Sequence, residues 1–173
     1  MLAVALALPS GLRAQGEPAV LPAPAVALVG GVVSTDFGEA DPAGDGTVFG
    51  LRLDFPLSSH IVLEPSVERL SLDFVTEDSD GTSVRWQADF ALRAELPLDR
   101  IRPFIGGSLG VLLWPGDVRP SDEDFVTATY GGAGGVIVGI TERLGLRAEA
   151  RLRWLDGLES STTTLTGGLS WRF

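Results

Sequence analysis

The chain has no cysteine, no lysine and a single histidine in its 173 residues. Without cysteine there is no disulfide, no thiolate catalysis and no cysteine-based metal site. All 13 basic residues are arginine, and 23 acidic residues bring the formal net charge to −10. A chain this acidic lacks the basic face that nucleic-acid binding requires, so no nucleic-acid partner is expected.

Long apolar runs are missing as well. The mean hydropathy is +0.24 and 45% of the residues are hydrophobic, yet 21% are charged. No window offers the roughly 18 apolar residues that a membrane-spanning helix needs. Residues 25–33 and 131–140 come closest, and each glycine of the second run disfavours a helix by about 1 kcal/mol. Both runs have the length of a membrane-spanning strand, for which about 9–11 residues suffice.

The N-terminal segment differs from the rest. Residues 1–14 have an apolar core that ends in small residues at Ala14, which resembles a secretory signal peptide without its usual positively charged start. A buried N-terminal helix is the alternative. Residues 15–24 are rich in proline and are expected to be an extended linker. The remaining residues, 25–173, are expected to form one domain.

Beyond residue 24, strand-like runs alternate with breaks. Apolar and polar residues alternate with a period of two, which is typical of strands with one apolar face. Eight strands are predicted, at residues 25–34, 47–55, 61–74, 83–96, 101–114, 125–140, 144–154 and 162–173. In the third run the alternation changes phase near Arg69, which predicts a β-bulge there.

The breaks differ in length. Residues 56–60, 97–100 and 141–143 form short breaks, whereas 35–46, 75–82, 115–124 and 155–161 form longer ones. The acidic surplus lies in the longer breaks, at Asp36, Glu39, Asp41, Asp45, Glu77, Asp78, Asp80, Asp117, Asp122, Glu123, Asp124, Asp156 and Glu159, with Arg119 as the one opposing charge. Eight runs with this alternation of break lengths predict an all-β, eight-stranded antiparallel up-and-down transmembrane β-barrel.

The last strand carries a resemblance to a known family. Leu169, Trp171 and Phe173 share one face of an alternating segment that ends in an aromatic residue. This resembles the C-terminal assembly signal of bacterial outer-membrane β-barrels, and residues 25–173 resemble the small eight-stranded barrels of the OmpA/OmpX type. The resemblance implies a Gram-negative outer membrane, with lipid and the barrel-assembly machinery as partners. It also implies periplasmic termini, a periplasmic linker at residues 15–24 and extracellular long breaks.

In a membrane barrel the polar strand faces point into the lumen and the apolar faces meet lipid. The polar faces here carry both signs of charge, as a buried ion-pair network requires. The predicted lumen network consists of Arg52, Asp54, Glu64, Glu68, Arg85, Asp89, Arg93, Glu95, Arg102, Arg147, Glu149, Arg151, Arg153 and Arg172. The interior of eight strands is about wide enough for side chains to fill, so no open channel is expected. The arginines are expected to lean over glycines.

Aromatic residues gather near the strand ends at two levels, as expected where a barrel crosses two membrane interfaces. The predicted aromatic girdle consists of Phe49, Phe55, Phe74, Trp86, Tyr130, Trp154, Trp171 and Phe173. Phe104 and Trp114 fall on the inward phase of their run, and are therefore not assigned to the girdle.

No catalytic, cofactor or metal site is predicted. His60 lies in a short break beside Ser58 and Ser59, with no evident oxyanion site. The acidic clusters at residues 41–45 and 122–124 offer oxygen ligands without the spacing of a dedicated calcium loop. We expect a non-enzymatic protein with a structural or surface-interaction role and an extracellular ligand. A narrow passive channel and a soluble lipocalin-like ligand-binding barrel are the alternatives.

Overall fold

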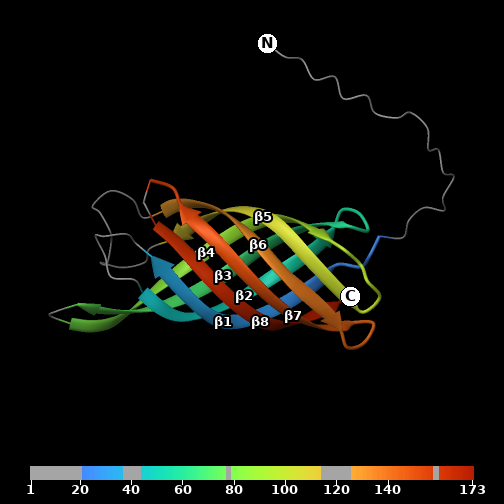
Figure 1. Cartoon of the computed structure of the whole chain (residues 1–173), viewed down its shortest axis with the longest axis horizontal. Helices are drawn as coiled ribbons and strands as arrows, with labels where there is room; N and C mark the ends of the chain where they lie inside the picture. The colour runs from blue at the N-terminus through green and yellow to red at the C-terminus, as the bar shows by residue number, and fades with distance from the viewer. Residues whose placement is uncertain (1–20, 37–43, 77–78, 114–125, 158–159) are drawn as a thin grey trace, which may run out of the picture.

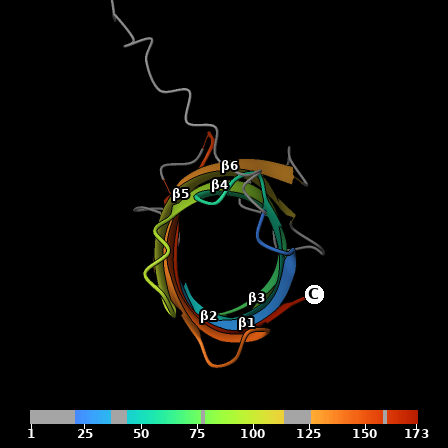
Figure 2. The same cartoon turned by 90° about the vertical axis from the view of Figure 1, so that its right-hand side faces the viewer.

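The computed structural model describes residues 21–36, 44–76, 79–113, 126–157 and 160–173. These contain eight strands: β1 (Ala25–Asp36), β2 (Gly44–Pro56), β3 (Ile61–Thr76), β4 (Ser79–Glu95), β5 (Ile101–Leu113), β6 (Val126–Gly139), β7 (Leu144–Leu155) and β8 (Ser160–Arg172). Each strand pairs with the next, and β8 pairs antiparallel with β1, which closes the barrel (Figures 1 and 2). The predicted eight-stranded antiparallel barrel is confirmed. In the described ranges no helix is long and apolar enough to cross a membrane.

The barrel has two different ends (Figure 1). The connections β2–β3, β4–β5 and β6–β7 lie at one end, here called the short-turn end, and the opposite end is called the long-loop end. The predicted long break at residues 75–82 is wrong, because β3 and β4 remain paired up to Thr76 and Ser79. These two strands project from the long-loop end as a hairpin (Figure 1). The polar residues of this segment were interpreted as a loop, whereas they belong to a strand pair that extends beyond the apolar part of the barrel.

The β-bulge predicted near Arg69 is also wrong. Arg69 lies opposite Phe49 on one side and Trp86 on the other, and both registers continue unchanged past it. Leu70 and Leu72 are buried, on the same inward face as Glu68, whereas Arg69 points outward. The apparent phase change arises because the inward face turns from charged to apolar toward the long-loop end, while the backbone remains regular.

An apolar layer therefore lies inside the barrel near the long-loop end. It consists of the buried side chains Val33, Val48, Leu70, Leu72, Leu112 and Leu155. Each residue lies toward the long-loop end of its strand, so the six side chains meet inside the barrel. Burial of this apolar area stabilises the fold by about 25 cal/mol per Å². Sequence analysis predicted a charged interior alone and missed this layer.

The outer surface is the apolar side of the sheet. Phe90, Ile105 and Leu109 expose 66, 71 and 70% of their surface. Leu92 is 53% exposed, and its neighbour Arg93 is 3% exposed. Large apolar residues outside and arginine inside reverse the order of a water-soluble protein, and this is the arrangement of a barrel embedded in lipid.

Candidate functional site in the lumen

The lumen holds a dense set of buried charges. Arg52, Glu64 and Glu68 have no exposed surface, and Arg153 exposes 1%. Residues of the predicted network that are buried are Arg52, Asp54, Glu64, Glu68, Arg85, Asp89, Arg93, Glu95, Arg147, Glu149, Arg151 and Arg153. Alternation along the strands places them on the inward face, and closure of the sheet brings distant strands together around them.

Glu64 on β3 lies at the centre of these contacts. Its Oε1 accepts a hydrogen bond from Arg151 Nη2 at 2.7 Å, and its Oε2 accepts one from Arg147 Nη2 at 2.5 Å. Arg93 also pairs with Glu64, and Arg52 Nη1 lies 3.6 Å from its Oε1. One carboxylate thus joins arginines from β2, β4 and β7, which fixes opposite walls of the barrel relative to each other.

A second group of ion pairs lies toward the long-loop end. Arg153 Nη2 lies 2.7 Å from Glu68 Oε2 and 2.6 Å from Asp89 Oδ2. Arg52 Nη2 lies 2.7 Å from the other oxygen of Glu68. Gln87 Nε2 donates to Asp89 Oδ1 at 2.7 Å and joins this group, although its uncharged side chain was not predicted to belong to it. The sequence does contain a signal for it, because the alternation along β4 places Gln87 on the same inward face as Arg85 and Asp89.

A third group lies toward the short-turn end. Arg93 Nη2 contacts Asp54 Oδ2 at 2.7 Å and Glu95 Oε1 at 2.6 Å. Arg102 Nη1 lies 3.3 Å from Glu95 Oε2. Arg172 is half-buried at this end, and none of the described carboxylates lies within 4 Å of it. The structure therefore joins Arg102 to the buried charges and leaves Arg172 outside the ion pairs.

Phe104 is the aromatic residue of this third group. The guanidinium carbons of Arg93 and Arg147 lie 5.0 and 4.9 Å from the centre of its ring, in cation–π range. A Cβ atom on Gly135 would lie 2.6 Å from Phe104 Cζ, so glycine leaves the room that this ring occupies. At Gly106 a Cβ atom would lie 2.7 Å from the Cβ of Arg93. At these two positions glycine makes space for the bulky inward neighbours Phe104 and Arg93.

The residues assigned to the aromatic girdle lie on the outer face where they are described. Phe49, Phe55, Trp86, Tyr130, Trp154, Trp171 and Phe173 are exposed, and the side chain of Phe74 lies outside the described part. Tyr130 and Trp154 stack with ring centres 5.9 Å apart. On β8, Leu169 and Trp171 point outward, and the backbone N–H of Phe173 donates to Pro24 O at 3.1 Å. The last residue is thus tied to the start of the barrel.

The other candidates are the residues around His60 and the acidic clusters, and in the described ranges they form no catalytic or metal-binding arrangement. His60 is exposed, and its Nδ1 lies 2.7 Å from Ser59 Oγ, while Ser58 Oγ accepts the backbone N–H of His60 at 3.2 Å and that of Ile61 at 3.0 Å. Ser58 therefore stabilises the turn. The described residues contain no cluster of three or more side chains suited to a metal. Residues 1–20, Trp114 and the acidic cluster at 122–124 lie outside the described residues.

A closed barrel with an apolar outside and a charged inside defines a transmembrane β-barrel protein. This chain belongs to the outer membrane protein beta-barrel domain family, whose model matches residues 2–173. The protein is accordingly a small β-barrel of the bacterial outer membrane, and the soluble lipocalin-like alternative is wrong. No curated protein matches the chain by sequence.

Solved structures with the same fold include three outer-membrane barrels. Neisserial surface protein A (NspA) has a TM-score of 0.71 at 13% identity, and the match covers 87% of this chain and 97% of that one. Ail, the attachment invasion locus protein of Yersinia pestis, has a TM-score of 0.57 at 10% identity, with 89 and 100% covered. The outer membrane enzyme PagL has a TM-score of 0.51 at 15% identity, with 87 and 100% covered. At these identities the likeness shows the fold alone.

Proposed function

We propose that this protein is a non-enzymatic outer-membrane barrel with a closed lumen, whose role is structural or a surface interaction through acidic extracellular loops. The observation that carries the proposal is the filling of the lumen, where Arg52, Glu64 and Glu68 have no exposed surface. Both termini are periplasmic in this proposal, and the long-loop end faces the cell exterior.

Two successive layers oppose passage through the barrel. The ion pairs around Glu64 join β3 to β7, so a solute has to break several charge-assisted hydrogen bonds to pass. Such bonds are roughly twice as strong as neutral ones. The apolar layer that includes Leu70 and Leu112 lies beyond them and fills part of the lumen beside the buried polar side chains of Arg85 and Gln87. A passive channel is the alternative that these layers disfavour.

The state of the lumen carboxylates argues against catalysis. Each of Asp54, Glu64, Glu68, Asp89, Glu95 and Glu149 lies within ion-pair distance of at least one arginine. General acid–base catalysis needs a group that can exchange its proton with a substrate within reach, and these groups are enclosed and engaged. PagL is an outer membrane enzyme, but this chain shares its fold without an assembled catalytic group in the described residues.

The long-loop end supplies the surface for an interaction. Asp36, Asp45, Asp73 and Asp156 are exposed there, and the sequence adds further acidic residues within 37–43 and 114–125. A concentration of one sign of charge attracts partners of the opposite sign and accelerates their binding. We infer that the extracellular ligand presents a cationic surface. Ail is named as an attachment protein, which makes a surface role compatible with this fold.

Two further roles belong to the proposal. Exposed aromatic residues such as Trp86, Trp154 and Trp171 form a girdle that sets the depth of the barrel in the lipid. Leu169, Trp171 and Phe173 form the signal by which the barrel-assembly machinery receives the last strand. No cofactor and no metal enters the proposed function.

Single-channel recording tests the closed lumen. The full barrel, refolded in micelles and inserted into a planar bilayer, is expected to give no discrete openings at 1 M salt. A positive control replaces Glu64, Arg151 and Leu70 by serine and removes material from both layers, so this variant is expected to conduct. If the unaltered protein gives discrete openings, and their number rises with the amount of barrel inserted in the bilayer, the closed lumen is contradicted and the passive channel is favoured.

A further inference from the structure

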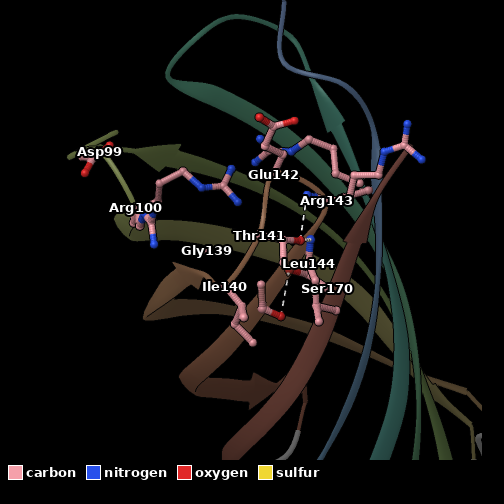
Figure 3. Close-up of a pocket in the computed structure, with 13 residues that line it drawn as sticks. Asp99, Arg100, Gly139, Ile140, Thr141, Glu142, Arg143, Leu144 and Ser170 are labelled. Carbon is pink, nitrogen blue, oxygen red and sulfur yellow. Dashed lines mark hydrogen bonds between the residues drawn. The ribbon is translucent and has the colours of Figure 1, made fainter.

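The short-turn end of the lumen opens into a cavity of about 540 Å³ (Figure 3). Its wall includes four arginines, Arg100, Arg102, Arg143 and Arg172, and two carboxylates. Figure 3 shows Asp99 and Arg100 on one side of this mouth and Glu142 and Arg143 on the other. The cavity thus collects basic residues from the turns β4–β5 and β6–β7, from the start of β5 and from the end of β8.

Among the described residues, most of this positive charge has no ion-pair partner. Of the four arginines, Arg102 alone has a described carboxylate within 4 Å, at Glu95. Asp99 and Glu142 are exposed, and neither lies within ion-pair distance of a described arginine. The lumen carboxylates are held by other arginines, as described above, so none remains for Arg172. Unpaired guanidinium groups gathered around one cavity are expected to attract an anion.

The backbone around the mouth is held in place by hydrogen bonds. Asp99 has a φ of 53°, a left-handed conformation that Asp tolerates, in the turn that carries Arg100. Thr141 Oγ1 accepts the N–H groups of Arg143 and Leu144 at 3.3 and 3.0 Å. The N–H of Arg172 donates to the carbonyl of Arg143 at 2.8 Å. The turns are thus ordered before any ligand arrives, which lowers the entropic cost of binding.

We propose that this mouth binds a phosphate-bearing anion, with Arg100, Arg143 and Arg172 as its ligating side chains. The planar guanidinium fork matches phosphate oxygens and donates two parallel hydrogen bonds. A volume of about 540 Å³ lies within the range of small-molecule sites and exceeds what one inorganic phosphate fills. The cavity therefore has room for a larger group that carries the phosphate.

Two sources of such a group are compatible with the position of the mouth. Arg172 lines the cavity, while Trp171, its neighbour on β8, points outward and is 46% exposed. A phospholipid headgroup from the surrounding leaflet and a soluble phosphate ester both reach this strand end. The chemistry of recognition is the same in both cases, and the experiment below separates them.

Pyrophosphate is the soluble probe. The full barrel is refolded in a maltoside detergent, which has no phosphate of its own, and titrated calorimetrically at low salt. Arg100, Arg143 and Arg172 are replaced by glutamine one at a time and all together in a triple variant. Each replacement is expected to weaken pyrophosphate binding by about tenfold, which corresponds to the loss of one charge-assisted hydrogen bond. Arg69→Gln is the matched control, because Arg69 is exposed on the outer face of β3. A difference in gel mobility between boiled and unboiled samples shows that each variant is folded.

Phosphatidylglycerol is the lipid probe. The same variants are reconstituted in nanodiscs of phosphatidylcholine with phosphatidylglycerol, released, and the retained lipids counted by native mass spectrometry. Loss of pyrophosphate binding in the triple variant alone supports a soluble ester. If only the triple variant loses its retained phosphatidylglycerol, and neither the unaltered protein nor any variant binds pyrophosphate, the result supports a lipid headgroup. Equal binding of both probes by the triple variant and Arg69→Gln overturns the site.

Discussion

Arg151 and Glu64 meet across the full width of the barrel. Nη2 of Arg151 on β7 lies 2.7 Å from Oε1 of Glu64 on β3, although these strands are four apart around a ring of eight. Neighbouring strands are joined by backbone ladders, but only a contact of this kind joins opposite walls. The long arginine side chain makes it possible, and the closed sheet keeps water away from it. The pair therefore constrains the cross-section of the lumen.

Removal of the central negative charge is expected to destabilise the barrel. Glu64→Gln leaves Arg93, Arg147 and Arg151 without the carboxylate they share, and breaking a buried ion pair by loss of one partner costs about 3–5 kcal/mol. Unfolding of the micelle-bound barrel in guanidinium chloride measures this loss of stability. Glu142→Gln makes the same chemical change at an exposed position and is expected to leave the midpoint in place. Equal midpoints for both variants contradict a stabilising role of the central charge.

The orientation of the strand faces gives a second prediction. Leu92 is 53% exposed near the middle of β4, so Leu92→Arg is expected to place a charge in the hydrocarbon layer and reduce the stability by about 2–4 kcal/mol. Unfolding of the barrel in lipid vesicles measures the change, with Leu92→Ala as a control for lost side-chain volume. A Leu92→Arg barrel as stable as Leu92→Ala indicates that this face does not contact lipid.

The apolar layer gives a third prediction. Leu70 is 2% exposed inside the barrel, and truncation of a buried leucine costs about 2–5 kcal/mol through lost transfer energy and the cavity left behind. Leu70→Ala is therefore expected to destabilise far more than Val67→Ala, which alters an outward residue that is 49% exposed. Comparison of the two unfolding midpoints tests this, and equal midpoints contradict a packed layer.

The sequence predicted strand number, direction and facing because these depend on local alternation. It failed at Arg69 and Leu70, where the same inward face changes from charged to apolar and imitates a shift of phase. It also missed the partners of Phe104, which come from β4 and β7. Alternation gives the face of a residue, but the depth of its side chain in the lumen depends on strand tilt and register. Which arginine meets which carboxylate follows from that depth and from ring closure.

The C-terminal residue gives a fourth prediction, which separates assembly from stability. Phe173 is 72% exposed at the end of β8, so Phe173→Ala is expected to leave the stability of the refolded barrel nearly unchanged. If the residue belongs to the assembly signal, the same variant accumulates less in the outer membrane of a Gram-negative host. Phe90→Ala, at an outward residue that is 66% exposed, is the control. Equal membrane levels of the two variants contradict a role of Phe173 in assembly.

The orientation of the barrel gives a fifth prediction, and the absence of native cysteine makes it simple to test. Asp156 follows β7 at the long-loop end, and Glu142 lies in the turn before β7 at the short-turn end; both are exposed. On intact cells, Asp156→Cys is expected to react with a membrane-impermeant maleimide, and Glu142→Cys only after the outer membrane is opened. Both reacting after permeabilisation confirms that both thiols are accessible. The reverse labelling places the arginine-lined mouth on the cell surface and the acidic loops in the periplasm, and so overturns the proposed extracellular role of the loops.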